Sequence, residues 1–331
     1  MLSPIIGSTP RPEPYFASAG ITAGASTQGS YLLELDAQAP AYWDGWRAGL
    51  TLALRRENRF GYYGRGNEAP YSDDSTTPAR PYFYEVSRTT RSARLTVQRR
   101  VLGPLRLLAG VTLARTDFRG LPGETVFERD LASGAVDPRR VPFADAAWRG
   151  GVVIDVRDHE IDPHQGVLLE ALHTDARGYT RTTGAAQVYV HPVERLILAA
   201  RAAIERMGGD PPLAAQLAIE SSTAPYPAVG GYRSLRGYRP GRFTGPGKLL
   251  AGVEARYALI YAPPYELKLV GFYDAGRVFG AGEAVRLTTR GLHSSGGAEV
   301  ALRLGRNTLF VLGAGVGSEG WELLVDSRWS Y

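Results

Sequence analysis

The chain has 331 residues, of which 44% are hydrophobic, and it contains no cysteine. The absence of cysteine excludes a disulfide scaffold, a thiol nucleophile, an iron–sulfur centre and a cysteine-based zinc site. The net charge is +5, but acids and bases are mixed along the whole chain, so we predict no nucleic-acid partner. No apolar run approaches the ~20 residues of a membrane-spanning helix, which leaves open a barrel of alternating strands.

Apolar and polar residues alternate through most of the chain, as expected of strands with one apolar face. In 248–261 the odd positions are apolar, whereas Lys248, Glu254 and Arg256 occupy even positions. Many such segments reach the ~9–11 residues of a strand that crosses a bilayer at a tilt. In chain order we predict fourteen strands: 14–24, 28–37, 46–56, 82–100, 105–117, 147–157, 166–175, 182–192, 194–206, 248–261, 265–279, 293–304, 307–317 and 320–331.

The connections between these segments favour a membrane barrel. Long ones fall at 57–81, 118–146 and 207–247, whereas others are as short as Val193 alone. Long loops at one end and tight turns at the other are typical of outer-membrane barrels. A soluble β-sandwich is the alternative, but the charges would then lie in an interior that should be apolar. Aromatic residues gather at strand ends, as interfacial girdles do: Tyr31, Trp46, Trp148, Tyr265 and Trp321.

Several motifs lie in and after the longest connection. Residues 230–238 read Gly-Gly-Tyr-Arg-Ser-Leu-Arg-Gly-Tyr, residues 252–256 read Gly-Val-Glu-Ala-Arg, and residues 270–278 read Val-Gly-Phe-Tyr-Asp-Ala-Gly-Arg-Val. An aromatic pair, Trp329 and Tyr331, ends the chain. Together these segments resemble the loop, strand and C-terminal signatures of the BamA/TamA superfamily, also called the bacterial surface antigen domain. The resemblance extends from about residue 14 to the end.

The resemblance implies an all-β fold, a transmembrane antiparallel β-barrel with a long loop, 207–247, folded into the lumen. The family barrel has sixteen strands, with this loop between the eleventh and twelfth. Here the loop follows the ninth predicted strand, so fourteen strands of a sixteen-stranded barrel would be visible and two would be missing at the N-terminus. Residues 1–13 would be an unstructured start or a remnant of the upstream barrel, and 14–331 the barrel itself.

The resemblance also assigns roles to individual residues. Arg236 would anchor the loop through rigid bidentate bonds, and alternation places both candidate partners, Asp274 and Glu254, on the lumen side. Gly237 would permit a tight turn, and Tyr238 would pack on the barrel wall. The loop motif comprises Gly230, Gly231, Leu235, Arg236, Gly237 and Tyr238; the wall partners are Gly252, Glu254, Phe272, Asp274 and Gly276; the C-terminal assembly signal is Trp329 and Tyr331.

The implied function is insertion or translocation of proteins at the bacterial outer membrane, without ATP or another cofactor. Expected partners are outer-membrane lipids, client outer-membrane or secreted proteins, and periplasmic proteins. The alternatives are the membrane barrel of a patatin-like surface phospholipase fusion and a passive pore. We predict no catalytic residue and no metal site in the chain itself. The segment 159–164 has the wrong spacing and a proline for a zinc-protease helix, and a strand rather than a helix follows Gly315–Gly320.

Overall fold

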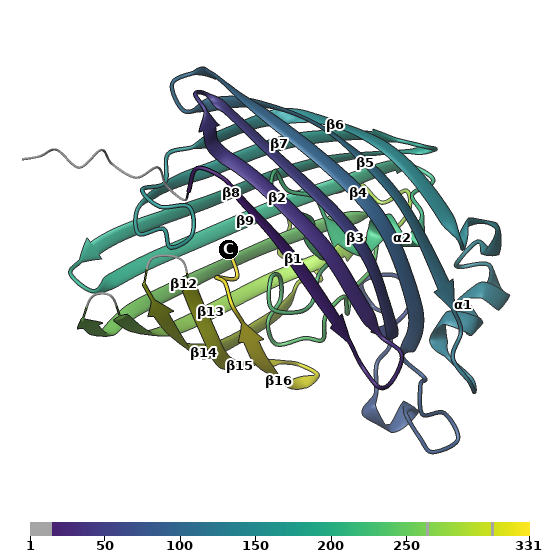
Figure 1. Cartoon of the computed structure of the whole chain (residues 1–331). Coiled ribbons are helices and arrows are strands. Elements are labelled where there is room, and N and C mark those ends of the chain that lie inside the picture. Colours follow the sequence, from purple (N-terminus) through teal and green to yellow (C-terminus); the bar gives the residue numbers. More distant parts are fainter. Residues whose placement is uncertain (1–14, 263–264, 306–307) are drawn as a thin grey trace, which may run out of the picture.

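The computed structural model describes residues 15–262, 265–305 and 308–331, and one antiparallel sheet of fourteen strands dominates it. The sheet curls around an interior that contains α2 and the C-terminus (Figure 1). Hydrogen-bonded neighbours follow chain order from β1 to β9, continue with β12 and end with β16. The all-β barrel architecture predicted from the sequence is confirmed. The predicted N-terminal segment 1–13 lies outside the described residues.

Each of the fourteen predicted strands is present, and most of them have shifted ends. The strands of the sheet are β1 (Ser18–Ala25), β2 (Tyr31–Trp43), β3 (Trp46–Gly61), β4 (Glu85–Leu102), β5 (Leu105–Arg119), β6 (Phe143–Asp155), β7 (Gly166–Ala176), β8 (Tyr179–Val193), β9 (Leu196–Gly209), β12 (Gly247–Ala262), β13 (Tyr265–Phe279), β14 (His293–Leu304), β15 (Thr308–Gly317) and β16 (Gly320–Asp326). A separate pair, β10 (Ala218–Ile219) and β11 (Tyr226–Pro227), lies in the connection between β9 and β12.

The two faces of the sheet have opposite chemistry. Along the middle of β12, even-numbered residues such as Glu254 and Arg256 are buried, whereas odd-numbered residues such as Val253 are exposed. Large apolar side chains are exposed on the outer face, including Trp148 and Trp321. Apolar side chains facing outward and charges facing inward are the arrangement of a barrel whose outer surface is solvated by lipid.

The long connections lie together at one end of the barrel. They join β3 to β4, β5 to β6, β9 to β12 and β13 to β14. The second contains α1 (Val126–Ser133) and the third contains α2 (Leu213–Gln216). None of the helices in the described ranges is long and apolar enough to cross a membrane. An apolar cluster packs these connections against one another and against the strands: Tyr62, Val86, Phe118, Phe127, Val136, Leu213 and Leu217.

The last strand is shorter than its sequence suggests. The prediction extended it to residue 331, but β16 ends at Asp326 and the remaining residues leave the sheet. Trp329 and Tyr331 are buried rather than lipid-facing. The alternation of residues alone could not show where β16 ends, because the pattern continues into the tail. The polar groups of the tail form their hydrogen bonds on the interior side of the barrel.

Candidate functional site: an arginine-pinned loop in the lumen

The connection between β9 and β12 turns back sharply at two glycines. Gly230 and Gly231 have φ angles of 119° and 94°, which side chains other than glycine rarely adopt. A Cβ on Gly230 would also lie 2.3 Å from the carbonyl oxygen of Arg239. The hydroxyl of Ser234 accepts from the Gly230 N–H at 2.9 Å and donates to the Ala228 carbonyl at 2.8 Å. This closed turn fixes the direction in which the following residues enter the lumen.

Arg236 lies at the centre of a buried ion cluster on the lumen wall. Its guanidinium donates to Asp274 through Nε–Oδ2 at 2.7 Å and Nη2–Oδ1 at 3.0 Å, a bidentate geometry that fixes direction as well as position. Nη1 donates to Glu254 Oε1 at 2.5 Å and to Glu299 Oε1 at 3.2 Å. These carboxylates belong to β12, β13 and β14, so one loop residue binds three adjacent strands.

Two further arginines, Arg256 and Arg201, complete the cluster. The sequence places Arg256 on the charged face of its strand, but it does not predict Arg256, Arg201 or Glu299 as members of this cluster. Arg256 Nη2 lies 2.6 Å from Glu254 Oε2, and Arg201 Nη2 lies 3.4 Å from Asp274 Oδ1. With the loop arginine, three guanidinium groups face three carboxylates, and all six side chains are buried. The equal number of positive and negative groups matters because an isolated buried charge costs several kcal/mol. This cost is on the order of the net stability of a whole domain. The alternation along each strand would have placed these side chains on the lumen face, but it could not have shown that they contact one another.

The residues after Arg236 pack the backbone of the loop directly against β15. A Cβ on Gly237 would lie 2.5 Å from the carbonyl carbon of Val316, so the absence of a side chain permits direct backbone contact. Gly237 lies in a tight turn, in which the Tyr238 N–H donates to the Leu235 carbonyl at 3.2 Å. Its φ is not positive, so the close approach to β15, rather than a left-handed backbone, is what requires glycine here. The Tyr238 hydroxyl lies 2.9 Å from Ser318 Oγ, and Leu235 is fully buried beside the Tyr238 ring.

The wall residues named from the sequence surround this contact. The guanidinium carbon of Arg236 lies 3.7 Å from the ring centroid of Phe272, a distance at which a cation is attracted to the face of the ring. A Cβ on Gly252 would lie 2.5 Å from Asp274 Oδ1, so this glycine leaves room for the carboxylate. Gly276 leaves room for the loop, because a Cβ there would lie 3.2 Å from a side-chain carbon of Val229.

The C-terminal tail enters the lumen beside the loop. Trp329 Nε1 donates to Asp162 Oδ1 at 2.9 Å, and Ser330 Oγ donates to Glu254 Oε1 at 2.7 Å. The tail therefore shares a carboxylate with the loop. The role of Trp329 and Tyr331 as an assembly signal stays a prediction, since both side chains lie inside the folded barrel.

Aromatic rings of the tail stack on the cluster's arginines. The guanidinium carbon of Arg256 lies 4.0 Å from the ring centroid of Trp329, and that of Arg201 lies 4.4 Å from the ring centroid of Tyr331. Cation–π contacts of this kind strengthen when water is excluded. The tail and the loop are consequently bound by the same set of charged wall residues.

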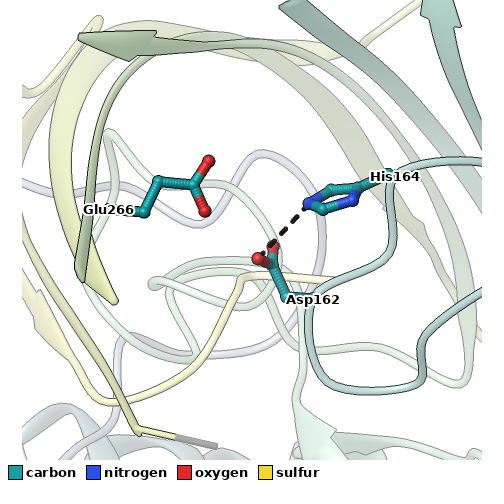
Figure 2. A group of neighbouring side chains, drawn as sticks. All are labelled: Asp162, His164 and Glu266. Atoms are coloured by element: carbon teal, nitrogen blue, oxygen red, sulfur yellow. Dashed lines mark ion pairs between the residues drawn. The ribbon is translucent and has the colours of Figure 1, made fainter. Parts of the chain in front are cut away.

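A second charged group lies where the β6–β7 turn meets the wall. Figure 2 shows Asp162, His164 and Glu266, whose ligand atoms lie within 4.8 Å of one another. Lys268 Nζ, however, lies 2.9 Å from Asp162 Oδ2 and 3.4 Å from Glu266 Oε2. Arg303 Nη2 lies 2.6 Å from the same Glu266 oxygen. Because these cations already neutralise both carboxylates, we interpret the group as an ion-pair network and assign it no metal.

Asp162→Asn is expected to lower the stability of the folded chain at neutral pH. Burial raises the pKa of Asp162, but the hydrogen bond from His164 and the charge of Lys268 lower that pKa more, so the net shift is downward. A carboxyl group with a depressed folded pKa stabilises the fold above its unfolded pKa of ~3.9 and loses that contribution as the pH falls through the folded value. The difference between the urea midpoints of wild type and variant should persist at pH 5 and shrink below about pH 4.

A difference between the two midpoints that disappears between pH 7 and pH 5 would contradict this role of Asp162. Asp158→Asn in the same turn is an unsuitable control, because Asp158 Oδ1 accepts three backbone N–H groups. Asp175→Asn is better suited, since Asp175 is an exposed residue near the end of β7.

The comparisons with known proteins agree with this geometry. Residues 17–317 match the model of the Omp85 superfamily domain. The structure is similar to BamA from Haemophilus ducreyi lacking POTRA domains 1-3, with a TM-score of 0.59 and 14% identity over 94% of this chain and 63% of that chain. It is also similar to CdiB from Escherichia coli, with a TM-score of 0.58 and 10% identity over 91% of this chain and 52% of that one.

CdiB from Acinetobacter baumannii gives a TM-score of 0.53 and 13% identity over 92% of this chain and 52% of that chain. At these identities the likeness shows the fold alone. The chain spans between half and two thirds of the length of these solved structures. No curated protein sequence matches it.

The family match covers most of the chain and agrees with the strand pattern and the pinned loop. The resemblance to BamA/TamA-type barrels and the predicted location in the bacterial outer membrane are confirmed. Barrels of this superfamily are not themselves enzymes. The chain belongs to the Omp85 superfamily and is a barrel of the bacterial outer membrane.

Proposed function

We propose that the chain is the membrane barrel of a protein that helps to insert or translocate other proteins at the outer membrane, without ATP. In this proposal residues 14–331 act as one barrel unit with 207–247 as its lumen loop. The clients are outer-membrane or secreted proteins, which periplasmic partners would deliver. The free energy would come from the client itself, because its strands pair and its apolar surface enters lipid.

The two end strands of the sheet carry the proposal. β1 has 8 residues and β16 has 7, whereas the other strands of the sheet have 10 to 18. In the described part of the chain, each is hydrogen-bonded to one neighbour only, β2 or β15. Short edge strands with free N–H and C=O groups can accept an incoming strand. A client strand would pair with the free edge of β16, or with that of the first strand of the barrel, which is β1 where no strand precedes it, and leave sideways into the membrane.

The filled lumen supports a lateral route. The loop, the tail and the wall charges lie in the interior, and beside them remain two adjoining cavities of about 440 and 380 Å³. The two cavities share Thr51, Arg94 and Ala224; tail residues line the first, and α2 residues line the second. While Arg236 pins the loop, a client in this proposal moves along the edge of the sheet.

Site-specific photocrosslinking tests this proposal. A photoreactive residue at Leu323 in β16, or at Ile21 in β1 of the 331-residue chain, should crosslink to a nascent outer-membrane protein during its assembly in vesicles without ATP. The same residue at Trp148 in β6 is the matched control, because the exposed fractions are 63%, 72% and 71%. Trp148 lies within the sheet between two hydrogen-bonded neighbours. Equal crosslinking at all three positions, or none at the edges, would be incompatible with edge pairing.

A further inference from the structure

We propose that the outer face of β3, β4 and β5 binds a phosphorylated lipid of the outer leaflet. Arg91 and Arg115 would bind the phosphate, and an apolar groove beside them would hold an acyl chain. The site lies on the opposite side of the barrel wall from the pinned loop. It depends on the membrane location of the barrel and is independent of the proposed handling of client strands.

The first observation is where these two arginines lie. Arg91 in β4 and Arg115 in β5 are direct partners in the antiparallel ladder, so their side chains project side by side. They share the outward face with Leu95 and Leu113, which are 43% and 54% exposed. Like charges directly opposite one another destabilise a strand pair, and a charge on the lipid face adds a further cost that depends on depth. An anion bound between them would remove both penalties.

The second observation is that protein carboxylates neutralise the pair only in part. Within the described ranges, no hydrogen bond or ion pair is recorded for Arg91. Arg115 contacts only Asp117, with Nε–Oδ2 at 3.5 Å and 56% of its side chain exposed. By contrast, Arg94 on the lumen face of the same strand lies 2.6 Å from Glu220. The guanidinium of Arg91 and the largely exposed guanidinium of Arg115 offer paired N–H donors, whose fork matches phosphate oxygens.

The third observation is a shallow, open apolar groove on the outer face beside Arg91. Its volume is about 660 Å³, and Arg91 forms part of its lining. The lining is otherwise largely aliphatic, so it fits a hydrocarbon chain better than a polar ligand. A lipid with a phosphate at one end would satisfy the groove and the arginines together. The side chains that line it on the outer face include Ile21, Leu33, Leu35, Leu52, Leu54 and Leu113.

The depth of the pair in the membrane matches a headgroup. On the outward face of β4, Arg91 and Arg99 enclose the apolar residues Ala93, Leu95 and Val97. The two arginines are 99 − 91 = 8 residues apart, which is about 26 Å along the strand. A strand tilt of ~35–45° reduces this to about 20 Å across the membrane, and the long arginine side chains can extend from there to both boundaries of the ~25 Å apolar band. Arg91 lies toward the long connections, which are extracellular in these proteins. The pair therefore meets the headgroups of the outer leaflet.

Binding of a defined lipid to the detergent-solubilised chain tests the proposal. The probe is lipid A carrying two phosphates, titrated by thermophoresis at low ionic strength. Wild type should bind saturably, and the double variant R91Q/R115Q should bind about 30-fold more weakly, since each basic residue near an anionic lipid surface contributes about fivefold. Dephosphorylated lipid A should bind wild type as weakly as lipid A binds the variant.

The matched control is R99Q, which removes an outward arginine from the same strand at the opposite boundary of the apolar band and should leave binding unchanged. Heat-modified gel migration verifies that each variant is folded. Inorganic phosphate at the same concentration should not compete, because it lacks the acyl chains that the groove holds. Unchanged binding by R91Q/R115Q, an equal loss in R99Q, or full competition by inorganic phosphate would each overturn the lipid site.

Discussion

Arg236→Ala should lower the free energy of unfolding by about 3–5 kcal/mol, because it removes one member of a buried ion cluster and leaves the others uncompensated. The side chain is fully buried and contacts three carboxylates. Without the guanidinium, Asp274 loses two hydrogen bonds and Glu299 its recorded salt bridge. Urea unfolding in detergent micelles measures the loss, and proteolysis within 207–247 reports whether the loop has left the wall.

Two further variants separate this effect from a general loss of positive charge. Arg239→Ala removes a nearby loop arginine that is 28% exposed and pairs with Asp73 at 3.2 Å and with Glu322 at 3.6 Å. Because exposed pairs contribute about 0–1 kcal/mol each, its cost should be below about 2 kcal/mol. Arg236→Lys keeps the charge but loses the bidentate fork, and its stability should fall between wild type and Arg236→Ala. If Arg236→Ala unfolds at the wild-type urea concentration with a protected loop, then the arginine does not pin the loop.

Gly237→Val should release the loop without changing any charge. A Cβ at this position would lie 2.5 Å from the carbonyl carbon of Val316 and 2.6 Å from Ser295 Cβ, so backbone would have to move. Overpacking of this kind costs about 1–3 kcal/mol or more, and displacement of the loop would also weaken the bonds of the neighbouring Arg236. The expected result is a protease-sensitive loop and a free energy of unfolding lowered by about 3 kcal/mol.

Gly271→Val provides the matched control for this overpacking experiment. Gly271 lies in β13, and a Cβ there would meet no atom within 4 Å. The same substitution should therefore leave both stability and loop protection near their wild-type values. Equal loop proteolysis in the two variants would show that close approach at Gly237 does not hold the loop.

The strand pattern was readable from the sequence because lipid and a charged lumen impose opposite requirements on successive residues. The predicted ranges 265–279 and 293–304 coincide with β13 and β14. The first strand begins at Ser18 instead of the predicted residue 14, because a strand begins where its residues first pair with the neighbouring strand. Here the pairing partner is Gln38 of β2. The alternation of apolar and polar residues shows which face of the sheet a side chain lies on, whereas pairing with the neighbouring strand determines where a strand ends.

The loop contact was only partly predictable. Arg236, Asp274 and Glu254 could be named because a motif and strand parity both point to them. Glu299 and the tail contacts depend on how far two separate segments reach into the lumen, and no local pattern encodes that depth. Trp329 and Asp162, for example, are 167 residues apart in the chain.

Glu254 makes the loop and the tail thermodynamically coupled. Its Oε1 accepts hydrogen bonds from Arg236 at 2.5 Å and from Ser330 at 2.7 Å. The free energy with which this oxygen binds one segment therefore depends on whether the other is in place. Linkage requires that the dependence be equal in both directions. A protein that pulls on the C-terminus thereby changes the affinity of the wall for the loop, with no direct contact to the loop.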